Sequence, residues 1–308
     1  MIFKWKKIGH IYRPQKNLFW NKSHAMLPTP VLIKKNICRV FFASRNKKNQ
    51  SHISFIDYSL TKKKIIFQSK KVSLYPGELG TFDDNGVVPS SIIKNGDKLY
   101  LYYVGWKPQS TTRYSLVSGL AISTNDGLSF KRFSRAPILS TTDKEPYMIL
   151  TAPSVIKDKK TWKMWYVSCT KWKSKNIPKY NIKYAESRNG KVWSQSGKVC
   201  IKLNKNERAV ARPSVLKIKN KFYMWYCKEN KVGNYTLGYA ISNNGKKWIR
   251  SDKKIGLYKS KIGWDSKMIT YPNVIFYNKK YYMFFNGNNY GQNGFGLAVS
   301  ENINEISN

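Results

Sequence analysis

The chain has 308 residues, of which 41% are hydrophobic and 15% aromatic, and it carries a formal net charge of +40. This apolar content is enough for a packed globular core. No stretch approaches 18 consecutive apolar residues, so the sequence predicts no transmembrane segment.

The excess positive charge comes from lysine. Only ten of the 56 basic residues are arginines, and lysines recur in every expected turn, for example at Lys94, 157–160 and 217–221. Arginine suits bidentate contacts to phosphates and bases, whereas evenly spread lysines are typical of a solvated surface. We therefore expect no specific nucleic-acid partner, and attraction to acidic glycans or phosphorylated substrates stays open.

The N-terminal residues and the cysteines favour a cytoplasmic protein. Residues 1–7 are not followed by an apolar run long enough for a signal peptide. The four cysteines are far apart in sequence and lack metal-ligand spacing, which predicts free, buried thiols in a reducing compartment. Because there is also no glycine-rich phosphate loop and no histidine cluster, we expect no metal and no cofactor.

Taken in chain order, the sequence repeats a proline-headed apolar strand about every 60 residues, the signature of stacked sheet units. The strand starts are Pro30-Val31-Leu32, Pro89-Ser90-Ser91-Ile92, Pro153-Ser154-Val155-Ile156, Pro213-Ser214-Val215-Leu216 and Pro272-Asn273-Val274-Ile275. An aromatic-rich second strand follows each, as in 162–166 and 222–226. Third strands run into Asn-Gly or Asp-Gly turns, which supply the positive φ angles of tight hairpins. Each unit is predicted to be a four-stranded antiparallel meander.

The fifth unit stops after its third strand, near Ser300, and would leave an exposed sheet edge. The N-terminus contains matching pieces: Phe3-Lys4-Trp5 and Phe19-Trp20-Asn21 parallel Lys247-Trp248 and Gly263-Trp264-Asp265. We therefore expect an all-β fold, a five-bladed β-propeller of four-stranded antiparallel blades that forms one domain over residues 1–308. Residues 3–13 are expected to complete the last blade and close the ring.

The segments that lead into the first strands hold the candidate site residues, except Trp106, which follows a second strand. In a propeller the first strands line the central channel, so these segments are expected to share one rim. Six of the 16 acidic residues lie in five such windows. The predicted catalytic carboxylates are Asp84, Glu145, Glu207 and Asp265, and the predicted substrate-binding residues are Trp20, His24, Asp83, Trp106, Arg208, Arg212 and Trp264.

Clustered carboxylates suit one kind of chemistry in particular. In a cleft they raise one another's pKa, so that one donates a proton while another stays charged. Glycoside cleavage or transfer needs such a pair, and tryptophans offer flat apolar platforms for sugar rings. The alternative is structural: the acids cap turns or pair with Arg208, Arg212 and the abundant lysines.

The repeat, with Pro-Ser-Val-Ile strand starts and a Tyr-Ala-Ile-Ser-Asn-Asn-Gly-Lys-Lys-Trp hairpin at 239–248, resembles the five-bladed propeller glycosidases of families 43, 32 and 68. It also resembles the N-terminal propeller of plant glucosamine inositolphosphorylceramide transferases. The family 43 resemblance implies an Asp base directly before the first blade's proline. Thr29 precedes Pro30 here, and the acidic motifs of family 32 are not reproduced.

Three functions follow from these observations. The first is a carbohydrate-active enzyme, a glycoside hydrolase or transglycosidase, that acts on a glycosidic bond in polysaccharide metabolism or surface-glycan assembly through the rim carboxylates. The second is a non-catalytic propeller that binds a glycan or nucleotide sugar and assists a partner transferase. The third, a basic scaffold for nucleic acid or anionic lipid, is disfavoured by the even spread of lysines.

Overall fold

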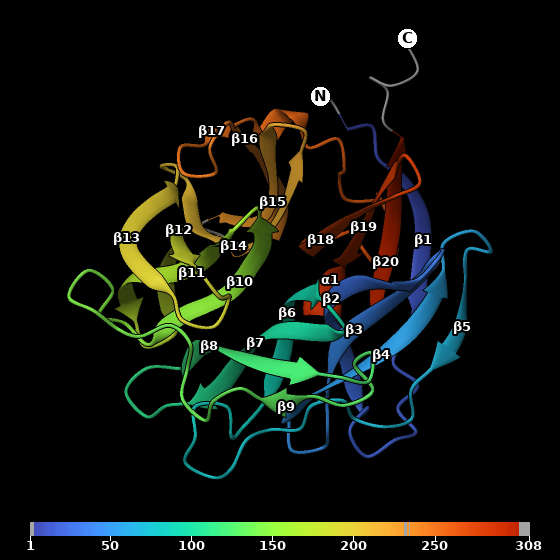
Figure 1. The fold of residues 1–308 in the computed structure, drawn as a ribbon, viewed down its shortest axis with the longest axis horizontal. Coiled ribbons are helices and arrows are strands. Elements are labelled where there is room, and N and C mark those ends of the chain that lie inside the picture. The colour runs from blue at the N-terminus through green and yellow to red at the C-terminus, as the bar shows by residue number, and fades with distance from the viewer. Residues whose placement is uncertain (1–2, 231–232, 234, 302–308) are drawn as a thin grey trace.

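The computed structural model describes residues 3–230, 233 and 235–301 and consists of β-sheet (Figure 1). Its described residues contain twenty strands, one 3₁₀ turn (Asp252–Lys254) and one short helix, α1 (Asn288–Gly291). The predicted all-β class is confirmed. Within the described part, no helix has the length and apolarity needed to cross a membrane.

The strands of the described residues pair into five four-stranded units. Unit 1 contains β2 (Ser23–Lys34), β3 (Ile37–Arg45), β4 (Ser51–Ser59) and β5 (Lys64–Gln68). Unit 2 contains β6 (Val87–Asn95), β7 (Lys98–Pro108), β8 (Tyr114–Ser123) and β9 (Lys131–Arg132). Unit 3 contains β10 (Ile149–Asp158), β11 (Thr161–Ser174), β12 (Ile177–Ser187) and β13 (Ser194–Ile201). Unit 4 contains β14 (Glu207–Ile218), β15 (Lys221–Asn230), β16 (Tyr235–Ser242) and β17 (Ile249–Arg250). Unit 5 contains β18 (Thr270–Tyr277), β19 (Lys280–Asn286), β20 (Phe295–Glu301) and β1 (Lys6–Tyr12).

Each unit is an antiparallel meander, as predicted, and the last one takes its outer strand from the other end of the chain. β1 pairs antiparallel with β20, with Lys6 opposite Val299 and Lys7 opposite Ala298. Phe3 continues this join, because its buried ring packs edge-on against Trp225 of unit 4 and Tyr281 of unit 5. The pairing predicted for residues 3–13 is therefore observed over Lys6–Tyr12.

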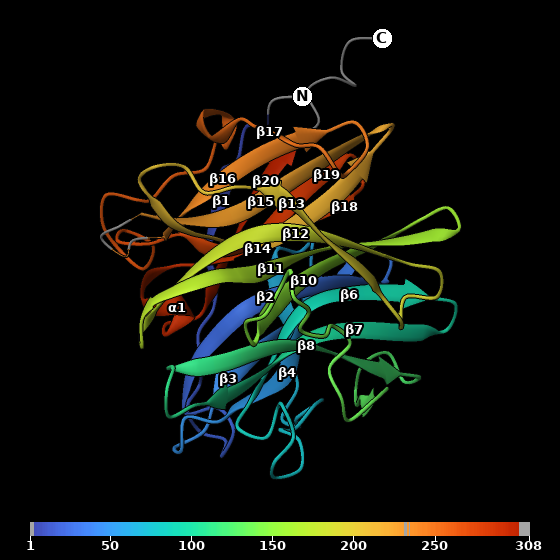
Figure 2. The ribbon, with the colours of Figure 1, turned by 90° about the vertical axis from the view of Figure 1, so that its left-hand side faces the viewer.

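The first strands of the units lie next to one another around the middle of the molecule (Figure 1). They contact in the order β2, β6, β10, β14, β18, and β18 contacts β2 again. Short parallel bridges from β8 to β10 and from β12 to β14 join units 2, 3 and 4 into one twelve-stranded sheet. Figure 2 turns the molecule by 90° and shows α1 at one end of these strands.

A β-bulge interrupts the first strand of every unit, and it corrects the alignment of the repeat. The register shifts at Met26/Thr29, Pro89/Ser91, Thr151/Ser154, Ala211/Ser214 and Thr270/Asn273. In unit 1, the residue equivalent to Pro153, Pro213 and Pro272 is therefore Pro28 instead of Pro30. In unit 2, it is Ser90 instead of Pro89. The sequence pattern misplaced these two units because a proline lies close to the bulge in both.

The bulge also explains the Pro-Ser-Val motif. In three consecutive pairs of units, a serine after the bulge accepts a hydrogen bond from the valine N–H of the next unit's first strand. The bonds run from Val155 to Ser91, from Val215 to Ser154 and from Val274 to Ser214, at 3.0–3.1 Å. Pro30 occupies the valine position in unit 1 and has no N–H to donate. The motif therefore joins neighbouring units through buried serine hydroxyls.

Aromatic side chains fill the space between units, and the glycines of the hairpin turns pack against them. Tyr102 Oη donates to Gly190 O and Trp165 Nε1 donates to Gly245 O, both at 2.7 Å. Each glycine has φ 73°, and an added Cβ would lie within 3 Å of Trp162 or Trp165. The four cysteines are free and buried, as predicted, and burial raises the pKa of Cys169 and Cys227 to about 11.

Candidate functional site

A cavity of about 700 Å³ lies where the first strands of all five units meet. Each first strand contributes at least one residue at or beside its bulge: Leu27 (β2), Val88 (β6), Ala152 (β10), Arg212 (β14) and Tyr271 (β18). We call this space the central cavity. Its volume lies in the range of small-ligand sites.

Backbone geometry aims these bulge residues inward. Leu27, Ala152, Arg212 and Tyr271 have φ between 49° and 55°, the left-handed region that costs energy for residues with a Cβ. Bulges and positive φ values both concentrate at functional sites, where they redirect a side chain. The repeated bulge therefore places one altered strand position per unit at the same cavity.

The charged residues of the cavity wall are mostly arginines. Arg45, Arg113, Arg208 and Arg212 line it, which is four of the ten arginines in the chain. Among the described lining residues there is no lysine and no aspartate, and Glu229 is the one carboxylate. In a chain with many more lysines than arginines, this selection indicates a site that uses the planar guanidinium group.

Glu229 is engaged by one of these arginines. It lies on β15, is 1% exposed, and accepts from Arg208 Nε at 3.0 Å and from Arg208 Nη2. The pair of carboxylate and guanidinium raises the pKa of Arg208. Glu229 therefore offsets the charge of Arg208, and the other three arginines of the lining have no carboxylate partner among the described residues.

The remaining wall is aromatic and apolar. Trp106 on β7 and five tyrosines contribute to it, and these tyrosines are Tyr114, Tyr180, Tyr235, Tyr271 and Tyr290. Tyr114 and Tyr180 join their hydroxyls at 2.8 Å. Burial raises the pKa of Tyr180 and Tyr271 well above the usual value, so these phenols stay neutral. Aromatic faces with arginines between them suit a ligand that has flat apolar faces and negative charge.

Three of the predicted substrate-binding residues, Trp106, Arg208 and Arg212, line the central cavity. The predicted catalytic carboxylates do not. Asp83, predicted to bind substrate, lies outside the cavity as well and forms the same structural contact in unit 2 as Glu145 in unit 3: Asp83 accepts from Tyr103 Oη at 2.9 Å and from Arg132 Nε at 2.8 Å. Glu145 accepts from Tyr166 Oη at 2.7 Å and pairs with Lys183 Nζ at 3.2 Å.

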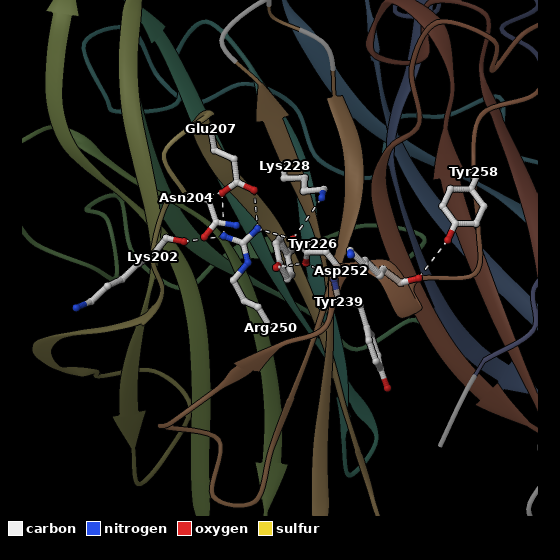
Figure 3. A network of polar contacts seen from close by, with 10 residues as sticks. Lys202, Asn204, Glu207, Tyr226, Lys228, Tyr239, Arg250, Asp252 and Tyr258 are labelled. Atoms are coloured by element: carbon white, nitrogen blue, oxygen red, sulfur yellow. Dashed lines mark hydrogen bonds and ion pairs between the residues drawn. The ribbon is translucent and has the colours of Figure 1, made fainter.

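Unit 4 repeats this contact with a larger network (Figure 3). Glu207 accepts from Arg250 Nη1 at 2.8 Å and from Nη2 at 2.6 Å, while Asp252 accepts from Tyr226 Oη at 2.6 Å. In unit 5, Asp265 pairs with Lys7 of β1. Asp83, Glu207 and Asp265 are thus held by cations on the outer strands of their units, whereas Glu145 pairs with Lys183 on the third strand of unit 3.

The register of the outer strands explains why these acids recur. In each of these units, the outer-strand partner of the acid pairs with an alanine at the same position of the third strand. These partners are Arg132, Gln195, Arg250 and Lys7. Gln195 Nε2 donates to Glu145 at 3.2 Å. We call this repeated contact between a carboxylate of the leading segment and the outer strand the carboxylate clasp. The expected convergence of these carboxylates on one rim is therefore not observed.

The other predicted residues also lie outside the cavity. Trp20 is 1% exposed and packs against Phe42, with Nε1 donating to Lys70 O at 3.2 Å. Trp264 stacks between His10 and Phe285. His24 contacts Ser23, and Asp84 pairs with Lys107 at 3.0 Å.

Several cavity residues escaped the sequence analysis. Arg45 ends β3, Arg113 directly precedes β8, and Glu229 lies near the end of β15. All three are outside the windows before the first strands. The scarcity of arginine was a usable signal, since four of ten arginines meet here. The corrected repeat also moves the family 43 base position from Thr29 to Leu27, which is apolar.

The described residues hold no group of three or more His, Cys, Asp or Glu side chains that would bind a metal. The polar groups that line the central cavity are guanidinium groups, phenols, an indole, hydroxyls, amides and one paired carboxylate.

Comparison with known proteins identifies the family. Residues 28–250 match the family described as the glycosyl hydrolases family 32 N-terminal domain. The chain belongs to this family. Uncharacterized protein MT1551 of Mycobacterium tuberculosis (strain CDC 1551 / Oshkosh) is 36% identical over 303 residues, which cover 97% of this chain and 99% of that protein.

Solved structures of glycoside hydrolases share the fold of this family member. A structure described as a glycoside hydrolase has a TM-score of 0.73 at 15% identity and covers 98% of this chain and 93% of its own. A structure from work on the GH130 family of mannoside phosphorylases has a TM-score of 0.74 at 12% identity, with 97% and 94% covered. Bombyx mori GH32 beta-fructofuranosidase BmSUC1 has a TM-score of 0.63 at 15% identity, with 90% and 61% covered. The resemblance to propeller glycosidases is confirmed.

Proposed function

We propose that this protein binds a carbohydrate in the central cavity, as a glycan- or nucleotide-sugar-binding propeller that assists a partner transferase in surface-glycan assembly. The observation that carries the proposal is the cavity wall, which combines Trp106 and five tyrosines with arginines at the meeting point of five first strands. Membership of a glycosidase family supports a sugar as the ligand class.

The proposal includes the finer architecture. The five units are taken as the blades of one closed propeller and one domain, with β1 completing the last blade. The contacts of β18 with β2 and the pairing of β1 with β20 support this arrangement. The buried free thiols agree with a cytoplasmic protein, which we include in the proposal.

Binding without cleavage is favoured by the count of carboxylates. Glycosidases with two carboxylates place them about 5–10 Å apart across the scissile bond. The described wall of the central cavity has Glu229 alone, held by two hydrogen bonds from Arg208. A second carboxylate to complete the pair is not among the described lining residues.

The second candidate is an enzyme that acts on a glycosidic bond. Its support is the fold, which is that of glycoside hydrolases, together with the presence of Glu229 inside the cavity. Catalytic roles for Asp84, Glu145, Glu207 and Asp265 stay a prediction, and their ion pairs do not favour it.

Calorimetry with a panel of neutral saccharides, acidic glycans, sugar phosphates and nucleotide sugars tests the proposal, with product analysis of the same mixtures. We expect binding of at least one class and no bond cleavage. Absence of binding across the panel contradicts the proposed function. Cleavage that disappears in a fully folded Glu229→Gln variant supports the enzyme instead, and cleavage that disappears in a fully folded Glu145→Gln variant supports the carboxylates predicted from the sequence.

A further inference from the structure

The central cavity contains more positive charge than its own residues neutralise. Arg212 is 1% exposed, and its guanidinium donates from Nη1 to Ser90 Oγ at 2.5 Å and from Nη2 to Thr29 Oγ1 at 3.0 Å. Both acceptors are neutral hydroxyls. Burial lowers the pKa of Arg212 to about 10, because a buried charge without a counter-charge is costly.

Two more guanidinium groups add to this excess. Arg45 makes no side-chain hydrogen bond or ion pair with the described residues, and burial together with the charge of Arg113 lowers its pKa. Arg113 lies over the ring of Tyr114, with no carboxylate partner in the described part of the chain. Since Glu229 pairs with Arg208, three cationic side chains of the wall have no anionic partner in the part of the chain that the structure describes.

Two buried polar atoms of the wall also have no hydrogen-bond partner within the described residues. These are Nε of Arg212 and Oγ1 of Thr151, whose residues are 1% and 5% exposed. Thr151 on β10 and Ala211 on β14 occupy the same position before the bulge in neighbouring units, and Arg212 follows Ala211. Buried polar groups are nearly always paired, so unpaired donors at the wall of a cavity indicate an absent acceptor.

The number and kind of donors select the acceptor. A carboxylate carries one charge, whereas a phosphate monoester carries about 1.5–2 negative charges near neutral pH and three acceptor oxygens. Guanidinium groups match phosphate oxygens with paired N–H bonds. Three unneutralised arginines and a free hydroxyl therefore suit a phosphoryl group better than a uronic acid.

We propose that the central cavity contains a phosphoryl-binding subsite, in which Arg212 Nε and Thr151 Oγ1 donate to a phosphate whose charge is balanced by Arg45 and Arg113. This inference rests on the proposed function and narrows its ligand to a phosphorylated carbohydrate, either a sugar phosphate or a nucleotide sugar. The aromatic residues of the wall, among them Trp106 and Tyr114, contact the sugar or the base.

Calorimetry with inorganic phosphate, glucose 1-phosphate, UDP-glucose and methyl glucoside distinguishes a sugar phosphate from a nucleotide sugar as the ligand. We expect glucose 1-phosphate or UDP-glucose to bind more tightly than inorganic phosphate, and methyl glucoside to bind more weakly than glucose 1-phosphate. A hydrogen bond to a charged group corresponds to about tenfold or more in affinity. Arg45→Gln, Arg113→Gln and Thr151→Val are each expected to weaken phosphate binding about tenfold.

Thr151→Val is the decisive variant, because it replaces an unpaired buried hydroxyl with a methyl group and should leave the melting temperature unchanged or raised. Arg188→Gln is the matched control for the two arginine variants, since Arg188 is exposed, does not line the cavity, and its loss changes the net charge equally. If the Arg45, Arg113 and Thr151 variants bind phosphate as tightly as this control does, the proposed phosphoryl-binding subsite is wrong. If methyl glucoside then still binds, the proposed function stands; if none of the four probes and no saccharide binds, the proposed function fails too.

Discussion

Arg212 on β14 donates from Nη2 to Thr29 Oγ1 on β2 at 3.0 Å, across 183 residues of sequence. Its other terminal nitrogen donates to Ser90 of β6, whose own hydroxyl donates to Pro153 O of β10. One buried side chain of unit 4 therefore contacts units 1 and 2 directly. This relationship makes Arg212 both a cross-link between first strands and a charge in the central cavity.

Arg212→Lys should destabilise the fold, because one ammonium group cannot reach both hydroxyls and remains buried without a carboxylate. We expect a loss of about 2–4 kcal/mol in the free energy of unfolding, measured by urea denaturation. Arg188→Lys, an exposed exchange of the same kind, should change it by less than about 0.5 kcal/mol. Equal stability of the two variants would contradict the cross-link.

The serine hydroxyls between units should each contribute measurably to stability. Ser154→Ala leaves the buried N–H of Val215 without its acceptor and should cost about 1–3 kcal/mol in urea unfolding. The exposed Ser196 gives the control Ser196→Ala, which is expected to be neutral. If Ser154→Ala is as stable as Ser196→Ala, the Pro-Ser-Val motif has another cause.

Much of the architecture could be predicted from sequence because the repeat is local and periodic. Asn-Gly turns, aromatic second strands and the unfinished fifth unit together predicted the meanders and the pairing of the N-terminal strand with the last one. The exact alignment of units 1 and 2 could not be predicted, since Pro30 and Pro89 lie within two residues of a bulge that only the strand register reveals.

The site was harder to predict, because periodicity identifies equivalent positions without giving the direction of a side chain. Asp83, Glu145 and Asp265 recur at equivalent places because each reaches the outer strand of its unit. The cavity residues outside the bulges follow no such period: Glu229 and Arg113 come from single units and lie together only through tertiary structure. Composition was the better signal for them.

Stability should depend on pH through His24. Burial, and then the charge of Arg45, lowers the pKa of this imidazole to about 4, so it is neutral in the folded protein. Its contribution is fully present above pH 6.5, the unfolded value, and is lost as pH falls from 6.5 towards 4. His24→Asn removes this titration and tolerates the left-handed φ of 63°.

Urea unfolding at about pH 7.5, 5.5 and 4.5 measures the effect of His24→Asn. Because the ring is partly exposed, we expect the variant to gain only about 1–2 kcal/mol relative to the wild type between the highest and the lowest pH. A difference between the two proteins that does not change with pH would show that His24 titrates normally in the fold.

The carboxylate clasp of unit 3 tests the two interpretations of the acidic windows against each other. Glu145 is 1% exposed and pairs with Lys183, which is 5% exposed, so Glu145→Gln leaves a buried ammonium without its anion. We expect a loss of about 3–5 kcal/mol in the free energy of unfolding and no change in affinity for the cavity ligand, because Glu145 does not line the cavity. Glu78→Gln breaks an exposed pair with Arg135 and should cost less than about 1 kcal/mol. If Glu145→Gln is fully stable but loses binding or turnover, Glu145 is part of the functional site. A carboxylate with a purely structural role can affect ligand binding only by destabilising the fold.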